Sequence, residues 1–175
     1  WDFHLREERK GIHLYVKNVF ISDDCRSLLP EYLRFVRGVV DSSDLPLNVS
    51  REILQDDAII RRIRKSLVGR LLKELGDLLG KDRETYHTFY EAFGLVFKEG
   101  ITQDMENNSD KLKDLLLFRS TTTEEATYTT LKEYTDRMPS GQEAIYFLIG
   151  ENKAAIGHAP HLEAFRTKGY EVLLL

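Results

Sequence analysis

The first third of the chain alternates between apolar and polar positions in a way that predicts one strand and one helix. Residues 12–21 alternate imperfectly and are rich in β-branched and aromatic side chains, which is typical of a strand. Pro30 suits the first position of a helix, and apolar residues from Leu33 to Val40 then recur at helical spacing. The pattern therefore predicts a strand at 12–21, followed by an amphipathic helix that ends near Asp41.

The middle of the chain has the period of two long helices. The first is predicted from Arg51 to Leu79, with Gly80 as its natural end, and the second begins at a cap formed by Asp82. The apolar stripe of the first helix consists of Ile60, Ile63, Leu67, Leu71, Leu75 and Leu78. The second helix carries Tyr86, Phe89, Tyr90, Phe93, Val96 and Phe97. Aromatic residues at this spacing indicate core packing, and residues 107–110 have the turn chemistry that precedes a further short helix.

The last sixty residues have the pattern of a compact α/β unit. Thr130 and Glu133 form a capping-box pattern for a short helix. The continuous apolar run at 144–149 is typical of a strand that is covered on both faces, and a helical stretch up to Lys168 follows it. A second apolar strand is predicted at 172–175. A strand, a helix and a strand in this order favour a parallel pair joined by a right-handed crossover.

Composition narrows the function classes. The 175 residues are 42% hydrophobic and 31% charged, which is ordinary for a soluble globular chain, and the formal charge of −4 disfavours nucleic acid. No apolar run approaches the roughly 20 residues that a membrane-spanning helix needs. The first residues lack the pattern of a signal peptide, and the single cysteine, Cys25, suits a reducing cytoplasm. We interpret Cys25 as a packing residue, because two carboxylates precede it and oppose a reactive thiolate.

Motifs for nucleotide, metal and covalent chemistry are absent from the sequence. There is no GxxxxGK[ST] phosphate loop, and Gly150 after a strand does not make a GxGxxG fingerprint. His158 and His161 share a spacing that could suit a helix face, but no third ligand completes a metal shell. His87 stands alone among aromatic residues. An enzyme acting on a small molecule is therefore the least favoured function.

One polar cluster remains as a candidate site. Arg51 and Gln55 lie four residues apart in the first turns of the predicted helix, with Asn48 in the preceding loop. A cation is unfavourable at a helix N-terminus, so Arg51 is either paired locally or available to an anion. A guanidinium and two amides could orient a terminal phosphate oxygen. The alternative is a local ion pair with one of four nearby carboxylates, namely Asp41, Asp44, Glu52 and Asp56.

The long helix after this cluster is unusually basic for an acidic chain. Its cationic residues are Arg61, Arg62, Arg64, Lys65, Arg70 and Lys73. Such a face is usually only solvated, although it could also attract a phosphate or an acidic partner.

Four stretches carry a resemblance to a known family. "LPEYLRFVRGVVDSSDLPLNVSREILQ" at residues 29–55 closely resembles the middle domain of the heat-shock protein 90 chaperones, especially the bacterial high-temperature protein G type. The resemblance continues in "HLYVKNVFISDD", "YEAFGLVFKEGI" and "KGYEVLLL", so it covers nearly the whole chain apart from the threonine-rich loop.

This resemblance implies a fold and a domain organisation. The expected fold is α/β, with two three-layer α/β/α units joined by a helical connector. Residues 1–80 would be the C-terminal part of the large unit, 81–115 the connector, and 116–175 the small unit. The first unit would be truncated, so the strand at 12–21 would have lost sheet neighbours.

The resemblance also implies a function. In that family the loop arginine, matched by Arg51, reaches the terminal phosphate of ATP bound by a separate N-terminal domain. Gln55 matches a residue that supports the loop, and Asn48 one that holds its conformation. ATP with Mg²⁺ would act in the full-length protein and would not bind this chain alone. The implied partners are the N-terminal ATPase domain, a C-terminal dimerisation domain that makes a homodimer, client proteins and co-chaperones, with no nucleic acid or membrane. The alternative is a pure interaction module in which the arginine is structural.

Overall fold

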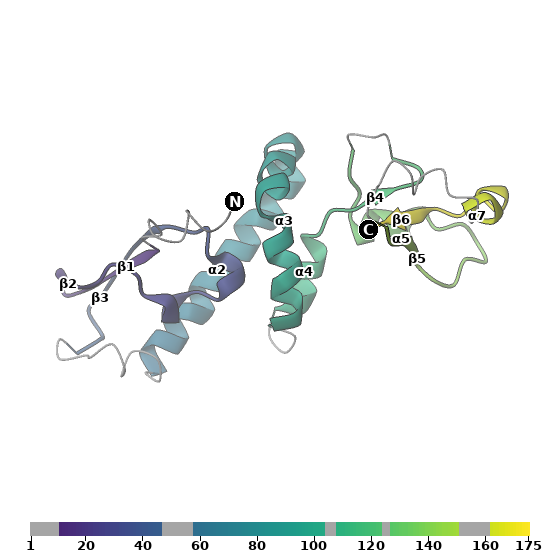
Figure 1. The fold of residues 1–175 in the computed structure, drawn as a ribbon. Helices are drawn as coiled ribbons and strands as arrows, with labels where there is room; N and C mark the ends of the chain where they lie inside the picture. The colour runs from purple at the N-terminus through teal and green to yellow at the C-terminus, as the bar shows by residue number, and fades with distance from the viewer. Residues whose placement is uncertain (1–10, 47–57, 104–107, 124–126, 151–161) are drawn as a thin grey trace.

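The structure is a computed structural model that describes residues 11–46, 58–103, 108–123, 127–150 and 162–175. It shows a mixed α/β fold of elongated shape, with one small sheet towards each end and helices between them (Figure 1). The helices between the sheets are α2 (Ala58–Lys81), α3 (Arg83–Gln103) and α4 (Ser109–Asp114). The predicted α/β class is therefore confirmed, whereas the division into three-layer units stays a prediction.

The first sheet contains a hairpin where the sequence predicted one continuous strand. Strands β1 (Ile12–Val16) and β2 (Val19–Ser22) pair antiparallel around the two residues Lys17 and Asn18, whose φ angles are 51° and 65°. Positive φ at both central residues is the geometry of the tight turns that match strand twist. The prediction of a single strand at 12–21 is wrong, because the sequence Lys-Asn lacks the glycine that usually marks such a turn.

The helix predicted after Pro30 is also wrong. A short 3₁₀ helix, η3 (Glu31–Leu33), follows Pro30, and the chain then enters strand β3 (Gly38–Ser42). β3 pairs parallel with β1 and gives the sheet order β2-β1-β3. Glycine is a poor helix former and Val39 and Val40 are β-branched, so pairing with β1 overrides the helical spacing of a few apolar residues.

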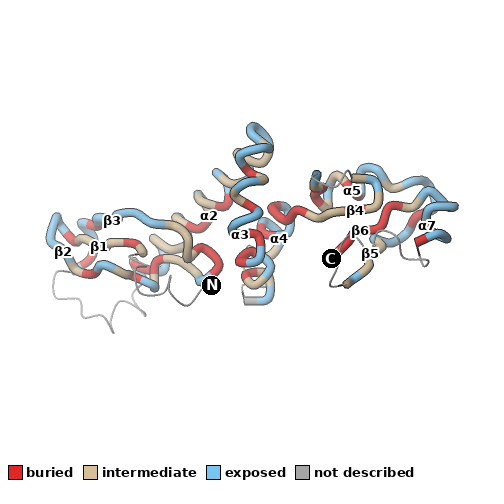
Figure 2. Tube along the Cα trace, turned by 45° about the horizontal axis from the view of Figure 1, so that its top comes forward, coloured by how far each residue is buried: buried red, intermediate tan, exposed pale blue. Residues whose placement is uncertain are grey.

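Helix α2 contributes to two apolar cores. Near its start, Ile60 packs under the first sheet with Leu14, Val16 and Leu45, which are almost fully buried. Further along, α2 contributes Val68 and Leu72 to a second core that it shares with α3 and α4. Figure 2 marks the buried residues of the helices in red, among intermediate residues in tan and exposed residues in pale blue. Of the aromatic residues predicted for the core, Tyr86, Tyr90 and Phe97 of α3 are buried in it and Phe89 packs against it, whereas Phe93 is only half-buried.

The C-terminal sheet has the predicted parallel pair but is covered less than expected. Strands β4 (Arg119–Ser120), β5 (Tyr146–Leu148) and β6 (Val172–Leu174) lie in the order β4-β6-β5, with β5 parallel to β6 and helix α7 (Glu163–Thr167) between them in the chain. β6 is buried throughout. However, Phe147 and Ile149 are 59% and 72% exposed, so the prediction that this strand is covered on both faces is wrong. An apolar run alone does not distinguish one covered face from two.

The predicted helix caps are largely confirmed. Asp82 accepts hydrogen bonds from the backbone N–H and the hydroxyl of Thr85, at 3.1 and 2.7 Å. Thr130 and Glu133 form the complete capping box at the start of α5 (Leu131–Arg137). Asn108 occupies the cap position of α4, but its side chain makes no capping hydrogen bond. Gly80, predicted to end α2, lies inside it, and the helix continues to Lys81.

Alanine substitutions at two helical glycines should change the free energy of unfolding in opposite directions. A Cβ added at Gly76 would meet nothing within 4 Å, whereas one at Gly100 would lie 2.6 Å from Cβ of Tyr32. Gly76→Ala should therefore stabilise the chain by about 0.5–1 kcal/mol, because alanine loses less conformational entropy in a helix. Gly100→Ala should instead destabilise it by about 1–3 kcal/mol, because the core is overpacked. Urea unfolding followed by circular dichroism measures both, and equal signs would contradict the prediction.

Candidate functional site

The three predicted site residues lie outside the part of the chain that the structure describes. Arg51, Gln55 and Asn48 all fall within residues 47–57, so the structure neither brings them together nor separates them. The flanking residues are described. Leu45, before this segment, and Ile60, after it, are each 1% exposed and pack in the same core under the first sheet. Described residues on either side of this segment therefore pack in one apolar core.

Polar side chains at the end of β3 accept hydrogen bonds from backbone N–H groups. The backbone N–H of Asp44 donates to the hydroxyl of Ser42 at 3.3 Å. The carboxylate of Asp41 accepts the backbone N–H of Asn18 at 3.2 Å. Asp41, one of the four carboxylates that could neutralise Arg51, thus already stabilises the turn of the hairpin.

The basic face of α2 is partly neutralised by its own helix. Arg70 pairs with Glu74 at 3.2 Å and Lys73 with Asp77 at 2.8 Å, each four residues apart. The hydrogen bond that Lys73 donates to Asp77 raises the pKa of Lys73. Arg62 and Lys65 are exposed near the start of the helix. This arrangement agrees with a solvated face whose cations are accessible to an acidic partner.

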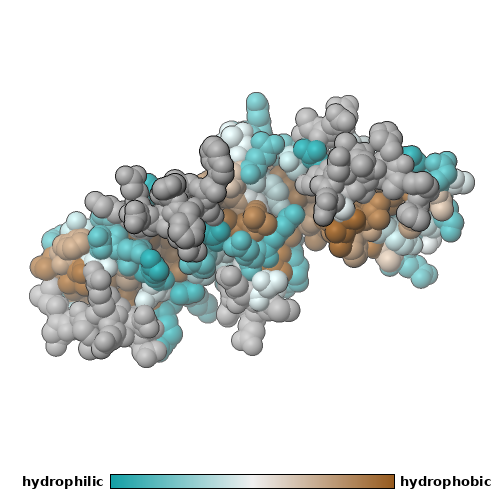
Figure 3. Space-filling model, viewed as in Figure 1, coloured by the Kyte–Doolittle hydropathy of each residue, from teal (hydrophilic) through white to brown (hydrophobic). Residues whose placement is uncertain are grey.

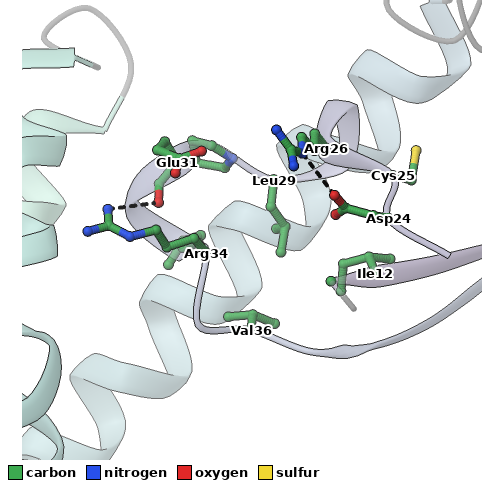
Figure 4. A pocket seen from close by; sticks show the side chains of 11 residues that line it. Ile12, Asp24, Cys25, Arg26, Leu29, Glu31, Arg34 and Val36 are labelled. Atoms are coloured by element: carbon green, nitrogen blue, oxygen red, sulfur yellow. Dashed lines mark hydrogen bonds and ion pairs between the residues drawn. The ribbon is translucent and has the colours of Figure 1, made fainter. Parts of the chain in front are cut away.

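A pocket of about 410 Å³ opens beside the first sheet, and no pattern along the chain predicted it. Figure 4 shows its lining, which includes the Arg26–Asp24 ion pair at 2.8 Å and Arg34, whose guanidinium donates to the carbonyl of Glu31. Arg34 also pairs with Glu99 of α3 at 2.9 Å. The pocket combines apolar and charged groups from β1, from a second 3₁₀ helix, η2 (Arg26–Leu28), and from η3, so it depends on contacts between separate segments of the chain.

Cys25 lines this pocket as a packing residue. It is 5% exposed, and burial raises the pKa of its thiol, although backbone hydrogen bonds lower it in part. A thiol with a raised pKa is a poor nucleophile. The interpretation of Cys25 as a structural residue therefore agrees with its environment.

Metal and membrane sites are not seen in the described segments. Among these residues no group of three or more His, Cys, Asp and Glu side chains could hold a metal ion. His158 and His161 lie outside the described residues. No helix in the described part of the chain is both long and apolar enough to cross a membrane.

Comparison with known proteins decides the family. A family model described as "Hsp90 protein" matches residues 2–175. The chain belongs to the Hsp90 family. Among its Hsp90 relatives, Chaperone protein HtpG of Geobacter sulfurreducens is 57% identical over 175 residues. The proteins of the same name from Bdellovibrio bacteriovorus and from a strain of Escherichia coli are 47% and 49% identical. All three alignments include the whole chain.

These Hsp90 relatives are bacterial chaperones and are much longer than this chain. The chain spans 27% of the Geobacter protein and 28% of the Escherichia coli protein. The match includes the segment that contains Arg51, Gln55 and Asn48, which the structure does not describe.

Proposed function

We propose that this chain is a middle-domain portion of an ATP-dependent chaperone. In this proposal Arg51 reaches the terminal phosphate of ATP that a separate N-terminal domain holds. The observation that carries the proposal is membership of the Hsp90 family over residues 2–175, together with an arginine in the sequence Ser-Arg-Glu-Ile-Leu-Gln at 50–55. Packing of Leu45 and Ile60 in one core supports it, because a rigid base limits where the loop between them can reach.

The role of Arg51 would be electrostatic. Its planar guanidinium can donate two parallel N–H bonds to phosphate oxygens and stabilise the charge that develops there during transfer. Gln55 would support the loop beside Arg51, and Asn48 would hold the loop's conformation. A cation at a helix N-terminus has no local benefit, which is consistent with a partner that arrives from another domain.

ATP with Mg²⁺ would supply the phosphoryl group and its charge neutralisation in the longer protein. The described residues of this chain do not fit a complete site for that group. They contain no cluster of three metal-binding side chains, and the sequence has no phosphate loop. The nucleotide therefore belongs to the N-terminal domain in this proposal, and the contribution of this chain is limited to its loop.

The same proposal includes the partners, the cellular location and the domain organisation of the longer polypeptide. The longer polypeptide would form a homodimer in the bacterial cytoplasm, through a C-terminal domain, and would bind unfolded or partly folded clients and co-chaperones. Divisions near residues 80 and 115 would separate the large unit, the helical connector and the small unit.

A pure protein-interaction module is the second candidate, favoured by exposed apolar surface. Figure 3 shows apolar atoms over the β2 end of the first sheet and over the C-terminal sheet. The most exposed large apolar side chains in the described segments are Val19, Phe20, Val39, Leu95, Ile145, Phe147 and Ile149. Scattered apolar residues are normal on a surface, but a contiguous patch marks an interaction site. In this alternative Arg51 is structural.

The two candidates differ in one measurement. ATP hydrolysis by the full-length chaperone should require Arg51 if the chain completes the ATPase site. It should be insensitive to Arg51 if the chain only binds other proteins. A steady-state ATPase assay of purified full-length protein with and without the substitution therefore separates them.

The isolated chain should bind ATP negligibly. Titration calorimetry with MgATP should show no binding tighter than about 10 μM, which corresponds to about −7 kcal/mol. The reason is that a single loop arginine cannot hold a nucleotide without a cradle of backbone N–H groups. The full-length protein is the positive control. Tight binding by the isolated chain would mean that it contains a nucleotide site of its own.

A further inference from the structure

A wide groove lies between the helical core and the C-terminal sheet. Its volume is about 890 Å³. One wall comes from α2, α3 and α4, and includes Leu72, Gly76 and Leu115, while the other comes from Thr130 and Glu133 at the start of α5. In Figures 1 and 2 a single segment of chain joins α4 to β4. Leu116 and Leu117 of this joining segment are buried in the core of the helical region, so the groove lies beside a packed connection.

Beside the groove, the two parts also contact each other through two aromatic side chains. Phe118 and Tyr128, beside the C-terminal sheet, pack against the core of the helical region. The backbones of Phe118 and Thr129 exchange two hydrogen bonds of 2.8 Å. This pairing fixes the backbone that carries the side chains of Phe118 and Tyr128. The ring of Tyr128 lies edge-on to His87 of α3, with centroids 5.3 Å apart. Rotation of one part against the other would have its axis at this contact.

Arg83, the first residue of α3, bridges the two parts at the groove. Its guanidinium forms an ion pair with the carboxylate of Glu133 through two hydrogen bonds, one of them 2.9 Å long. It also donates to the backbone carbonyl of Tyr128 at 2.9 Å. The hydrogen bond from Arg83 is the largest influence that lowers the pKa of Glu133, to about 2. Glu133 is therefore ionised and paired at neutral pH.

Glu133 is firmly connected to the rest of the C-terminal part. Its carboxylate accepts the backbone N–H of Thr130 at 2.9 Å and the hydroxyl of Thr129 at 3.3 Å. Arg137 donates to the same hydroxyl at 2.8 Å and to the carboxylate of Glu171, next to β6, at 2.7 Å. These hydrogen bonds connect Glu133 with both α5 and β6, so the two elements should move as one unit with it.

We propose that this junction is a hinge. Phe118 and Tyr128 are its pivot, and the Arg83–Glu133 ion pair is the latch that fixes the angle between the helical region and the C-terminal sheet. The ion pair should contribute a small free energy to the choice between two angles, because the side chains of Arg83 and Glu133 are 40% and 36% exposed. Pairs of such exposure change a two-state population by roughly fivefold, which is too little to determine whether either part folds.

Distance measurement between spin labels tests the hinge in the 175-residue chain. Labels are attached at Lys65→Cys on α2 and Lys168→Cys after α7, both exposed, with Cys25→Ala to remove the native thiol. Double electron–electron resonance then reports the distribution of their separation. Arg83→Ala should broaden this distribution, or increase a second population about fivefold.

Two further variants test the charge of the ion pair while an acceptor remains for the capping hydrogen bond of α5. Glu133→Gln keeps an acceptor for the backbone N–H of Thr130 but removes the charge, and it should broaden the distribution as Arg83→Ala does. The double variant should be no broader than either single variant, because the two residues share one interaction. Arg70→Ala removes the exposed Arg70–Glu74 pair within α2 and should leave the distribution unchanged.

Hydrogen exchange distinguishes a latch from a structural support. The amides of β6 should keep their protection in both single variants, since the C-terminal sheet stays folded while its angle varies. Distributions that superimpose on the wild type would overturn the proposal. Loss of β6 protection together with broadening would also overturn it, because the ion pair would then hold the fold and not the angle.

Discussion

Replacing Arg51 with alanine in the full-length chaperone should lower ATP hydrolysis by about a hundredfold, at the low end for removal of a preorganised charge stabiliser. Nucleotide affinity should change little, because the proposal places the nucleotide in another domain. In the isolated chain the same substitution should change the free energy of unfolding by less than about 1 kcal/mol. It relieves a cation at a predicted helix N-terminus and removes at most one exposed ion pair.

Arg51→Lys should fail as well, and this separates geometry from charge. A compact ammonium cannot reproduce the planar fork of donors that contacts two phosphate oxygens, so the retained charge should not restore the rate. Arg70→Ala is the matched control, since Arg70 is an exposed arginine of α2 that pairs with Glu74. Steady-state ATPase assays are combined with thermal melts of the isolated chain. Persistent hydrolysis with a melting temperature lowered by several degrees would identify Arg51 as a structural residue.

The two long helices could be predicted from sequence because their signals are local. The apolar stripe of α2 and the aromatic stripe of α3 recur over many turns, and the capping residues Asp82 and Thr130 act within three positions. The first sheet could not be predicted in the same way. The turn at Lys17 and Asn18 carries no glycine, and β3 exists because it pairs with β1. Pairing between segments more than twenty residues apart leaves no periodic signal.

The proposed role of Arg51 depended on the family resemblance. Chemistry alone did not show that this arginine contacts a phosphate. From the residues alone, pairing of Arg51 with a nearby carboxylate is the favoured interpretation, and only the family match gives a reason to propose a phosphate instead. The network formed by Arg83, Glu133, Arg137 and Glu171 was not predicted at all. The capping box drew attention to Glu133, but the partners in these ion pairs lie 50 and 34 residues apart.

The largest stability effect is expected at Arg137. Its guanidinium donates to both carboxylate oxygens of Glu171, at 3.0 and 2.7 Å, and the side chain of Glu171 is only 9% exposed. Arg137→Ala would leave this carboxylate buried without its cation, a loss of about 3 kcal/mol. For a chain of this size the melting temperature should fall by roughly 6–12 °C. Arg70→Ala, which breaks an exposed pair, should cost less than about 1 kcal/mol.

The pH dependence of this loss identifies its cause. Burial is the largest influence on Glu171 and raises its pKa, but hydrogen bonds from Arg137, Ser120 and Thr122 outweigh it and lower the pKa below the usual 4.5. The pair therefore stabilises the wild type above pH 4.5, and this contribution is lost as the pH falls through the lowered pKa. In Arg137→Ala burial would dominate and the pKa would rise, so protonation would relieve the unpaired charge. Urea unfolding at pH 7.5 and near pH 4.5 should show the difference between variant and wild type shrinking at the lower pH. An equal difference at both pH values would mean that Arg137 stabilises the chain through packing of its alkyl chain and not through the charge of Glu171.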